Sequence, residues 1–192
     1  MIKLTTPLDA AKVSALKVGD EVAISGVLFT GRDAVHKYLH ENGPLPPGVS
    51  LSGGIIYHCG PVVIKDDAGQ WKVVAAGPTT SIREEPYQAD VMKHFNIKGV
   101  IGKGGMGAKT LKGCEETPAV YFHAIGGAAS YIAQTVTKVH GVFKMEFGVP
   151  EAIWVIEVRE FPVVVTMDSH GGSQHAVVEA SSKKILEDLL AR

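Results

Sequence analysis

The chain has 192 residues, enough for one full-sized domain with a substantial core. Acidic and basic residues almost balance, at 20 and 19, and the formal net charge is -1. A near-neutral surface argues against nucleic acid or an anionic membrane as a partner, because both select basic proteins. No apolar run approaches the roughly 20 residues that cross a bilayer, and the first residues lack the features of a secretion signal. We therefore expect one cytoplasmic domain over residues 1–192.

The cysteine content limits the metal chemistry of the chain. Its two cysteines, Cys59 and Cys114, are far apart in sequence and show no Cys-x-x-Cys spacing. Two such residues make neither a disulfide framework nor, alone, a zinc or iron–sulfur site. We expect buried, inert thiols, since free cysteine behaves as a small hydrophobic residue. Most ligands of any metal that serves this protein must come from elsewhere.

The apolar patterns predict strands and helices in alternation through the middle of the chain. Residues 21–31 alternate and are β-branched, which predicts a strand, and residues 32–43 show helical spacing that closes on a glycine. Two strands joined by a turn at 66–70 are predicted within 53–77. Further strands are expected at 97–105 and 119–127, and further helices at 84–96, 106–116 and 128–139.

The last fifth of the chain adds more β-structure and a helix. Residues 152–172 predict two strands interrupted near Phe161 and Pro162. Residues 181–192 predict an amphipathic helix capped by Ser181 or Ser182. There is no internal repeat and no long linker. Alternating strands and helices with β-rich flanks are typical of an α/β layered domain with a mixed sheet.

Three predicted loops at strand exits each bring a cation. Arg32 follows the strand at 21–31, Arg83 closes the stretch GPTTSIR, and Lys103 lies in the stretch GKGGMG. In layered α/β folds, ligand groups gather where loops leave the carboxyl ends of strands. Each cation alone also fits a solvated surface charge. The three together, each beside glycine at a strand exit, predict a site.

The residue types in these loops indicate a small dianion. The fork of an arginine matches a carboxylate or a phosphate, and a lysine supplies a compact point charge. The hydroxyls of Thr79 and Thr80, with backbone amides freed by glycine, complete a shell around such an anion. The sequence therefore predicts a site for a dicarboxylate or a phosphate ester.

The stretch GKGGMGAKT resembles a phosphate-binding Walker loop but departs from it at one position. That motif needs lysine directly after its second glycine, whereas Ala108 separates Gly107 from Lys109. One extra residue turns the lysine by about 100° around the opening helix. We therefore do not expect nucleotide hydrolysis.

None of the eight histidines has the His-Glu-x-x-His spacing of a metal site. His36 and His40 form an i, i+4 pair that we interpret as a solvated helix face. His58 and His123 lie inside apolar runs, which is typical of core residues or of residues that line a site. His170 belongs to a polar, glycine-rich loop at 167–175, and its role stays open.

Several stretches in this order resemble a known family. The chain is similar to the β subunit, equivalent to the C-terminal domain, of class I iron–sulfur-dependent fumarate hydratases and L-tartrate dehydratases. The resemblance runs from about residue 4 to residue 175. The matching stretches are TTPL, GRDAVHKYL, YHCGPV, GPTTSIR, VIGKGGMG, AIGGAA, GVPEAIWVIEV and VTMDSHG.

The resemblance implies a swivelling β/β/α domain that pairs with a larger α subunit, in a higher oligomer of αβ pairs. Three cysteines of that subunit hold a 4Fe–4S cluster, whose fourth iron binds the substrate and acts as a Lewis acid on the departing hydroxyl. Carried over by position, the substrate-binding residues are Arg32, Thr79, Arg83 and Lys103. Thr79 matches the threonine proposed as the base that removes the C3 proton.

Two roles remain open for Thr79. A threonine hydroxyl is too weak an acid to act as a base without a neighbouring carboxylate or cation, and the family account places that aspartate on the α subunit. Thr79 is therefore either the base or a donor that positions a substrate carboxylate.

The expected activity is the reversible hydration of fumarate to (S)-malate. One alternative is the β subunit of an L(+)-tartrate dehydratase, which forms oxaloacetate. The others are a non-catalytic assembly module and a stand-alone binder of phosphorylated metabolites.

Overall fold

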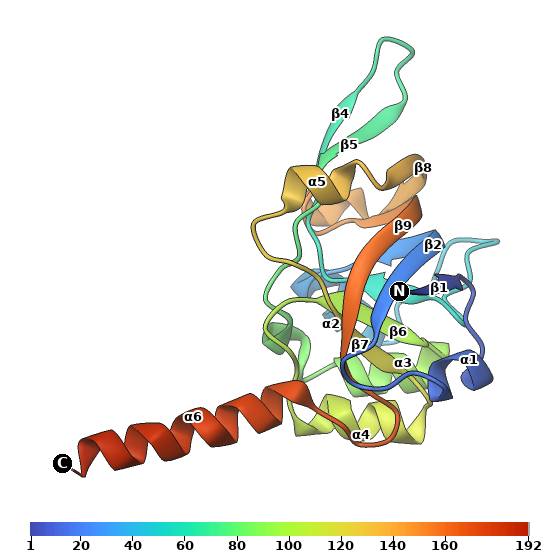
Figure 1. The fold of residues 1–192 in the computed structure, drawn as a ribbon. Helices are drawn as coiled ribbons and strands as arrows, with labels where there is room; N and C mark the ends of the chain where they lie inside the picture. The colour runs from blue at the N-terminus through green and yellow to red at the C-terminus, as the bar shows by residue number, and fades with distance from the viewer. Residues whose placement is uncertain (192) are drawn as a thin grey trace.

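A seven-stranded mixed sheet forms the centre of the fold (Figure 1), as seen in the computed structural model, which describes residues 1–191. The strands lie in the order β1-β2-β3-β6-β7-β9-β8. Their bounds are β1 Ile2–Thr5, β2 Glu21–Thr30, β3 Ile55–Tyr57, β6 Gly99–Gly102, β7 Val120–His123, β8 Val136–Phe143 and β9 Ile153–Met167. The α/β layered fold with a mixed sheet is confirmed.

The sheet closes into a barrel-like ring. Strands β1, β2, β3, β6 and β7 run parallel, each hydrogen-bonded to the next. The long strand β9 runs antiparallel to β7 and also to β2. Because β9 pairs with both, the strands β2, β3, β6, β7 and β9 complete a ring, and β1 and β8 extend it on the outside.

Two hydrophobic cores follow from the alternation of side chains along the strands. Ile55 and Tyr57 point into the core enclosed by the ring, whereas Ile56 between them joins the core under the helices. Tyr121 likewise faces the helices between two ring-facing neighbours. The helices that cover this outer core are α2 Asp33–His40, α3 Gln88–Phe95 and α4 Ala108–Glu116. Apolar runs at the strand positions are therefore buried on both faces, as parallel strands require.

Two elements project from the body (Figure 1). One is a two-stranded hairpin of β4 Val62–Lys65 and β5 Trp71–Ala75. The other is the helix α6 Gln174–Leu190, which runs away from the sheet. The short helices α1 Ala10–Ser14 and α5 Ala129–Ala133 and the 3-10 turns η1 Ser81–Glu84 and η2 Met145–Phe147 complete the fold. No helix within residues 1–191 has the length and apolarity needed to cross a membrane.

The helix predicted at 128–139 is wrong beyond its first turn. Only Ala129–Ala133 is helical, and Val136 and Val139 belong to strand β8, which pairs with β9. Their spacing is compatible with a helix, but the stretch is rich in β-branched residues, and strand pairing decides such cases.

The strand break predicted near Phe161 and Pro162 is also wrong. Strand β9 runs through both residues. The ladder to β2 is irregular just before them, and Glu160 has a φ of 51°. A proline is tolerated beside such an irregularity because a bulge already interrupts the regular hydrogen bonding.

Three other boundaries differ from the predictions. The stretch 53–77 contains three strands, of which β3 belongs to the main sheet. The helix predicted at 84–96 begins only at Gln88, after the turn η1. Helix α6 begins at Gln174, capped by Ser173, whose hydroxyl accepts a hydrogen bond from Ala176 N at 3.2 Å. Ser181 and Ser182 lie inside this helix and are not its cap.

Candidate functional site

The segment GPTTSIR fills the gap between the carboxyl ends of β3 and β6. Thr79 N donates to His58 O at 2.7 Å, and Lys103 N donates to Thr79 O at 3.2 Å. Ser81 N donates in turn to Lys103 O at 3.0 Å. Backbone hydrogen bonds therefore fix the threonines directly beside Lys103, at the edge of the sheet where ligand groups are expected.

Ion pairs hold the two arginines. Arg83 donates to both carboxylate oxygens of Asp33, with 3.1 Å between Arg83 Nε and Asp33 Oδ1. Arg32 Nε lies 3.2 Å from Glu151 Oε1, in an ion pair whose angles are not those of a hydrogen bond. Because Asp33 follows Arg32 in the chain, its pair with Arg83 ties the two arginine-bearing segments together.

The structure therefore brings all four predicted residues to one edge of the sheet. Backbone bonds link Thr79 to Lys103, and an ion pair links the Arg83 segment to the residue after Arg32. Gly60 makes room for this arrangement, since a Cβ there would lie 3.0 Å from Arg32 Nη1. The sequence analysis missed that acidic partners already hold both arginines.

A buried carboxyl lies behind the cations. Glu84 follows Arg83 and is fully buried, and neither of its oxygens has a hydrogen-bond partner. Burial raises its pKa to about 8, the nearby Asp33 adds to the rise, and the charges of Arg83 and Arg32 oppose it. Glu84 is therefore mostly neutral at pH 7. A glutamate beside a site arginine is the sequence signal that could have identified it.

Two buried histidines lie beneath the site. The Nε2 atoms of His36 and His58 each lie 2.9 Å from the side-chain amide of Gln88. The prediction of a solvated face is wrong for His36, which is fully buried because helix α3 covers that side of α2; His40 is exposed. His58 is buried, as one of its two interpretations requires. Burial lowers the pKa of both buried rings, that of His58 well below its usual value.

An internal carboxylate occupies the position where a Walker loop holds phosphate. Glu85 accepts hydrogen bonds from Gly107 N at 2.8 Å, Lys109 N at 2.9 Å and Thr110 N at 3.1 Å. It also accepts one from Thr110 Oγ1 at 2.6 Å. These donors form the N-terminus of α4, where an anion is most stabilised. Glu85 already serves as that anion, which disfavours a phosphate ester at this loop.

The residues of this chain do not fit an iron–sulfur cluster. Burial raises the pKa of Cys59 and Cys114 to about 12, so both stay protonated thiols, whereas a cluster needs thiolates. Within residues 1–191, no group of three His, Cys, Asp or Glu side chains is arranged to hold a metal ion.

His123 and His170 belong to no metal-binding group within residues 1–191. His123 at the end of β7 has a buried Nδ1 without a hydrogen-bond partner. His170 Nε2 lies 2.8 Å from Ser14 O and ties its loop to α1.

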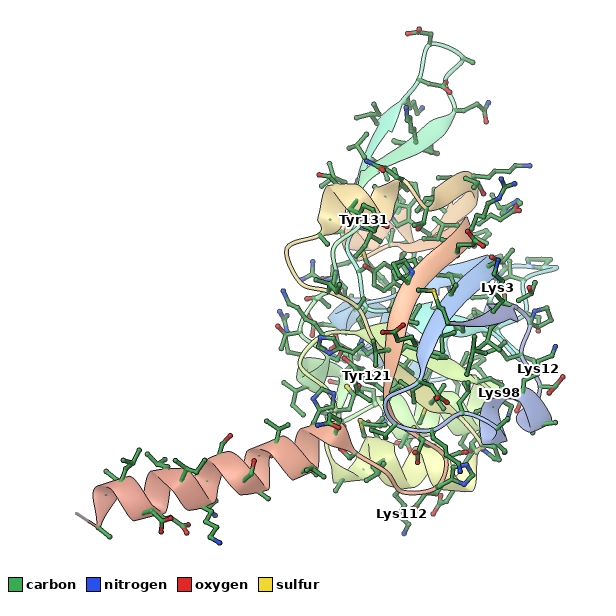
Figure 2. The ribbon with its side chains drawn as sticks, in the orientation of Figure 1. Lys3, Lys12, Lys98, Lys112, Tyr121 and Tyr131 are labelled. Atoms are coloured by element: carbon green, nitrogen blue, oxygen red, sulfur yellow. The ribbon has the colours of Figure 1, made fainter. Side chains whose placement is uncertain are left out.

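Large apolar side chains are exposed around the site. Ile82 lies between Ser81 and Arg83 and is 51% exposed. Ile125 is 67% exposed and precedes Gly126, where a Cβ would lie 3.5 Å from Lys103 Cδ. Tyr131 on the outside of α5 is 62% exposed (Figure 2). Such residues beside a polar site are typical of a surface that another protein covers.

Comparison with known proteins gives one family. The model of the fumarase C-terminus family matches residues 1–178. A protein of Geobacillus stearothermophilus named "Putative fumarate hydratase class I" is 56% identical over 182 residues, which are 95% of this chain. The chain spans only 35% of that relative's length.

Two other relatives are close to this chain in length. The L(+)-tartrate dehydratase subunit beta of Escherichia coli is 37% identical over 96% of this chain and 90% of its own. A protein of Methanocaldococcus jannaschii named "Putative L(+)-tartrate dehydratase subunit beta" is 41% identical over 92% of this chain and 91% of its own.

Proposed function

Because the chain belongs to the fumarase C-terminus family, we propose that it is the β subunit of a hydro-lyase that reversibly hydrates fumarate to (S)-malate. The proposal rests on one observation: the same edge of the sheet carries Arg32, Thr79, Arg83 and Lys103. A C4 dicarboxylate offers two anionic ends to this group, whereas the phosphate-binding position nearby is already filled by Glu85. The enzyme is expected to act in the cytoplasm.

In this proposal the arginines bind and orient the substrate carboxylates. Arg83 gives two of its five N–H groups to Asp33, which fixes the plane of the guanidinium and leaves the other three for a ligand. Glu151 holds Arg32 less firmly, through one ion pair that is not a hydrogen bond. A prearranged cationic site acts most strongly on the charge that develops as the C3 proton leaves, because its dipoles need no reorganisation.

Thr79 and Lys103 complete the substrate-binding wall. Their backbones are hydrogen-bonded to each other, so we expect the hydroxyl and the ammonium group to act on the same ligand. We propose Thr79 as the residue nearest the C3 proton, either as its acceptor or as a donor to a carboxylate. Conservative replacement of Thr79 and Lys103 tests the alternative of a mere assembly module, which predicts normal turnover in an intact complex.

The proposal also requires a partner. No group within residues 1–191 fits the cluster, so we propose that an α subunit holds a 4Fe–4S cluster, which supplies a Lewis acid for the hydroxyl of malate. The exposed Ile82, Ile125 and Tyr131 around the site are the surface on which that subunit would close it. We further propose that the enzyme is an oligomer of αβ pairs, inactive as separate subunits.

The test is Arg83→Ala in the assembled enzyme, purified without oxygen. We expect the turnover of malate to fall by at least about 100-fold, since a cation that acts mainly in the transition state is lost. Arg159→Ala is the matched control, because Arg159 is an exposed arginine on β9. Near-normal turnover of the Arg83 variant, with the complex intact, would contradict the proposal.

L(+)-tartrate is the second candidate substrate. Relatives that match this chain over about nine tenths of their own length carry the name of tartrate dehydratase. Tartrate has the same two carboxylates, and the same cations would bind them. Assays of the complex on malate and on L(+)-tartrate, side by side, decide between the two.

A further inference from the structure

A chain of buried polar side chains connects the two segments that carry the arginines. At one end, His36 Nδ1 lies 2.9 Å from the backbone carbonyl of Arg32. At the other end, His58 Nδ1 lies 2.8 Å from Ser81 Oγ, in the segment between Thr79 and Arg83. Between the two rings lies the side-chain amide of Gln88, whose Oε1 is 2.9 Å from Nε2 of each ring. We call His36, Gln88, His58 and Ser81 the buried chain.

The buried chain is sealed from solvent and ties together separate elements. All four of its side chains are fully buried. They come from α2, α3, the exit of β3 and η1. From strand β7, Tyr121 donates to Ser81 Oγ at 2.9 Å and lies inside the body (Figure 2). Hydrogen bonds among these buried side chains tie their elements together in one arrangement.

The partners dictate where the protons lie. The carbonyl of Arg32 only accepts, so His36 carries its proton on Nδ1. Burial keeps both rings neutral, and His36 Nε2 is then an acceptor. The Gln88 atom that faces His36 Nε2 must therefore be a donor. A turn of the side-chain amide by about 180° exchanges Oε1 and Nε2 and brings the nitrogen, which can donate twice, between the two rings. With Oε1 between the rings, Gln88 Nε2 has no hydrogen-bond partner, and His36 would have to be a buried imidazolium.

With this assignment all hydrogen bonds from Gln88 through His58 to Ser81 are donated in the same direction. His58 accepts from Gln88 on Nε2 and donates from Nδ1 to Ser81 Oγ. Gly102 packs tightly against these side chains, because a Cβ on Gly102 would lie 1.8 Å from Ser81 Oγ and 3.2 Å from His58 Nδ1. A displaced ring therefore displaces the hydroxyl, and with it the backbone that holds Thr79 and Arg83.

We propose that the buried chain is a positioning network that sets the Arg32 segment and the Thr79–Arg83 segment in one catalytically competent geometry. None of its members touches solvent, so none is a catalytic residue. The inference rests on the proposed function for its activity measurement. The protonation pattern of the buried chain, by contrast, can be measured on the isolated polypeptide.

The first test is the tautomeric state of the histidines, read by 15N NMR of the labelled full-length chain. We expect two buried rings that are neutral at pH 7 and protonated on Nδ1. In Gln88→Leu, which keeps the volume of the side chain but removes both donors, the ring signals of His36 and His58 should change. A proton on Nε2 of either ring in the wild type, or a charged ring, would overturn the assignment.

The second test uses two variants of His58 that each keep one end of its connection. His58→Asn retains a polar group near the Nδ1 position and the bond to Ser81, whereas His58→Gln retains one near the Nε2 position and the bond to Gln88. We expect each to lower kcat/KM of the assembled enzyme by about 10-fold or more, with both kcat and KM affected. His94→Asn, on the exposed face of α3, is the control and should turn over normally.

The outcomes separate the two proposals. If Arg83→Ala abolishes turnover while Gln88→Leu and both His58 variants match the wild type, the positioning role is wrong and the proposed function stands. If Arg83→Ala also keeps full turnover, the proposed function fails, and the NMR result alone then decides whether the buried chain is assigned correctly. If the His58 and Gln88 variants lose turnover only to the extent that fewer complexes assemble, the buried chain contributes to stability and not to positioning.

Discussion

Replacing Glu85 with alanine removes the anion at the N-terminus of helix α4. Its carboxylate accepts four hydrogen bonds, of which three are part-buried and one, from Lys109 N, is exposed. Water replaces the exposed bond at little cost. If each part-buried bond contributes about 1 kcal/mol net, the variant loses about 3 kcal/mol of its free energy of unfolding. For a domain of this size, that loss lowers Tm by about 6–12 °C.

Urea unfolding followed by circular dichroism measures this loss. Glu116→Ala is the matched control, since Glu116 lies at the far end of the same helix and makes only an exposed pair with Lys112 at 3.6 Å. We expect the control to change stability by no more than about 0.5 kcal/mol. A loss below about 1 kcal/mol for Glu85→Ala would refute the view that its carboxylate fills an anion site.

Added phosphate gives the same reasoning a second test. The alanine variant exposes backbone N–H groups at a helix N-terminus, which is a ready site for an anion. Phosphate should therefore stabilise the variant, by about 2.7 kcal/mol at a concentration 100 times its Kd, and leave the wild type unchanged. Equal stabilisation of both proteins would show that phosphate binds elsewhere. It would then favour the alternative that the protein is a binder of phosphorylated metabolites.

Four further predictions concern the interior. Gly102→Ala should destabilise the chain by at least about 1–3 kcal/mol, because its Cβ would lie 1.8 Å from Ser81 Oγ, and the added replacement Ser81→Ala should restore part of the loss in urea unfolding. The free energy of unfolding should fall as the pH drops below about 6.5, by up to about 1.4 kcal/mol per pH unit for each of His36 and His58, since only the unfolded chain protonates them. Glu84, with a folded pKa of about 8, acts oppositely: its contribution is lost as the pH rises from 4.5 to 8, and urea midpoints of Glu84→Gln should lack this loss. Both cysteines should stay unreactive toward a thiol reagent until the chain unfolds; fast labelling of the native chain would contradict their burial.

The sheet and the candidate site could be predicted because local patterns carry them. Buried strands are continuous apolar runs, and glycine marks their exits, so Arg32 and Lys103 could be placed at strand ends from sequence. The sequence predicts that the segment of Thr79 lies at the exit of the preceding strand, β5. That strand, however, belongs to the projecting hairpin and not to the main sheet. Its true position between β3 and β6 depends on pairing that no local pattern encodes.

Partners that are distant in sequence explain the misses. His36 lies on the face of α2 next to Val35 and Leu39, but its burial depends on Gln88, 52 residues later. The capping of α4 by Glu85 crosses more than 20 residues, whereas sequence rules for caps look only at adjacent positions. The error at β8 has another source, because its residues satisfy helical and strand spacing at once and only the pairing with β9 resolves them.

The charge of the site follows from these tertiary contacts and differs from the sum of its cations. Arg32 is paired with Glu151 and Arg83 with Asp33, so Lys103 leaves one net positive charge when Glu84 is neutral. A dicarboxylate carries two negative charges, so this wall alone does not neutralise it. In the proposed complex, the remaining positive charge would come from the partner surface that closes the site. The two ion-paired arginines contribute more to the orientation of the substrate than to its neutralisation. Asp33 and Glu151 hold the guanidinium groups in place but also weaken the positive electrostatic field of these groups.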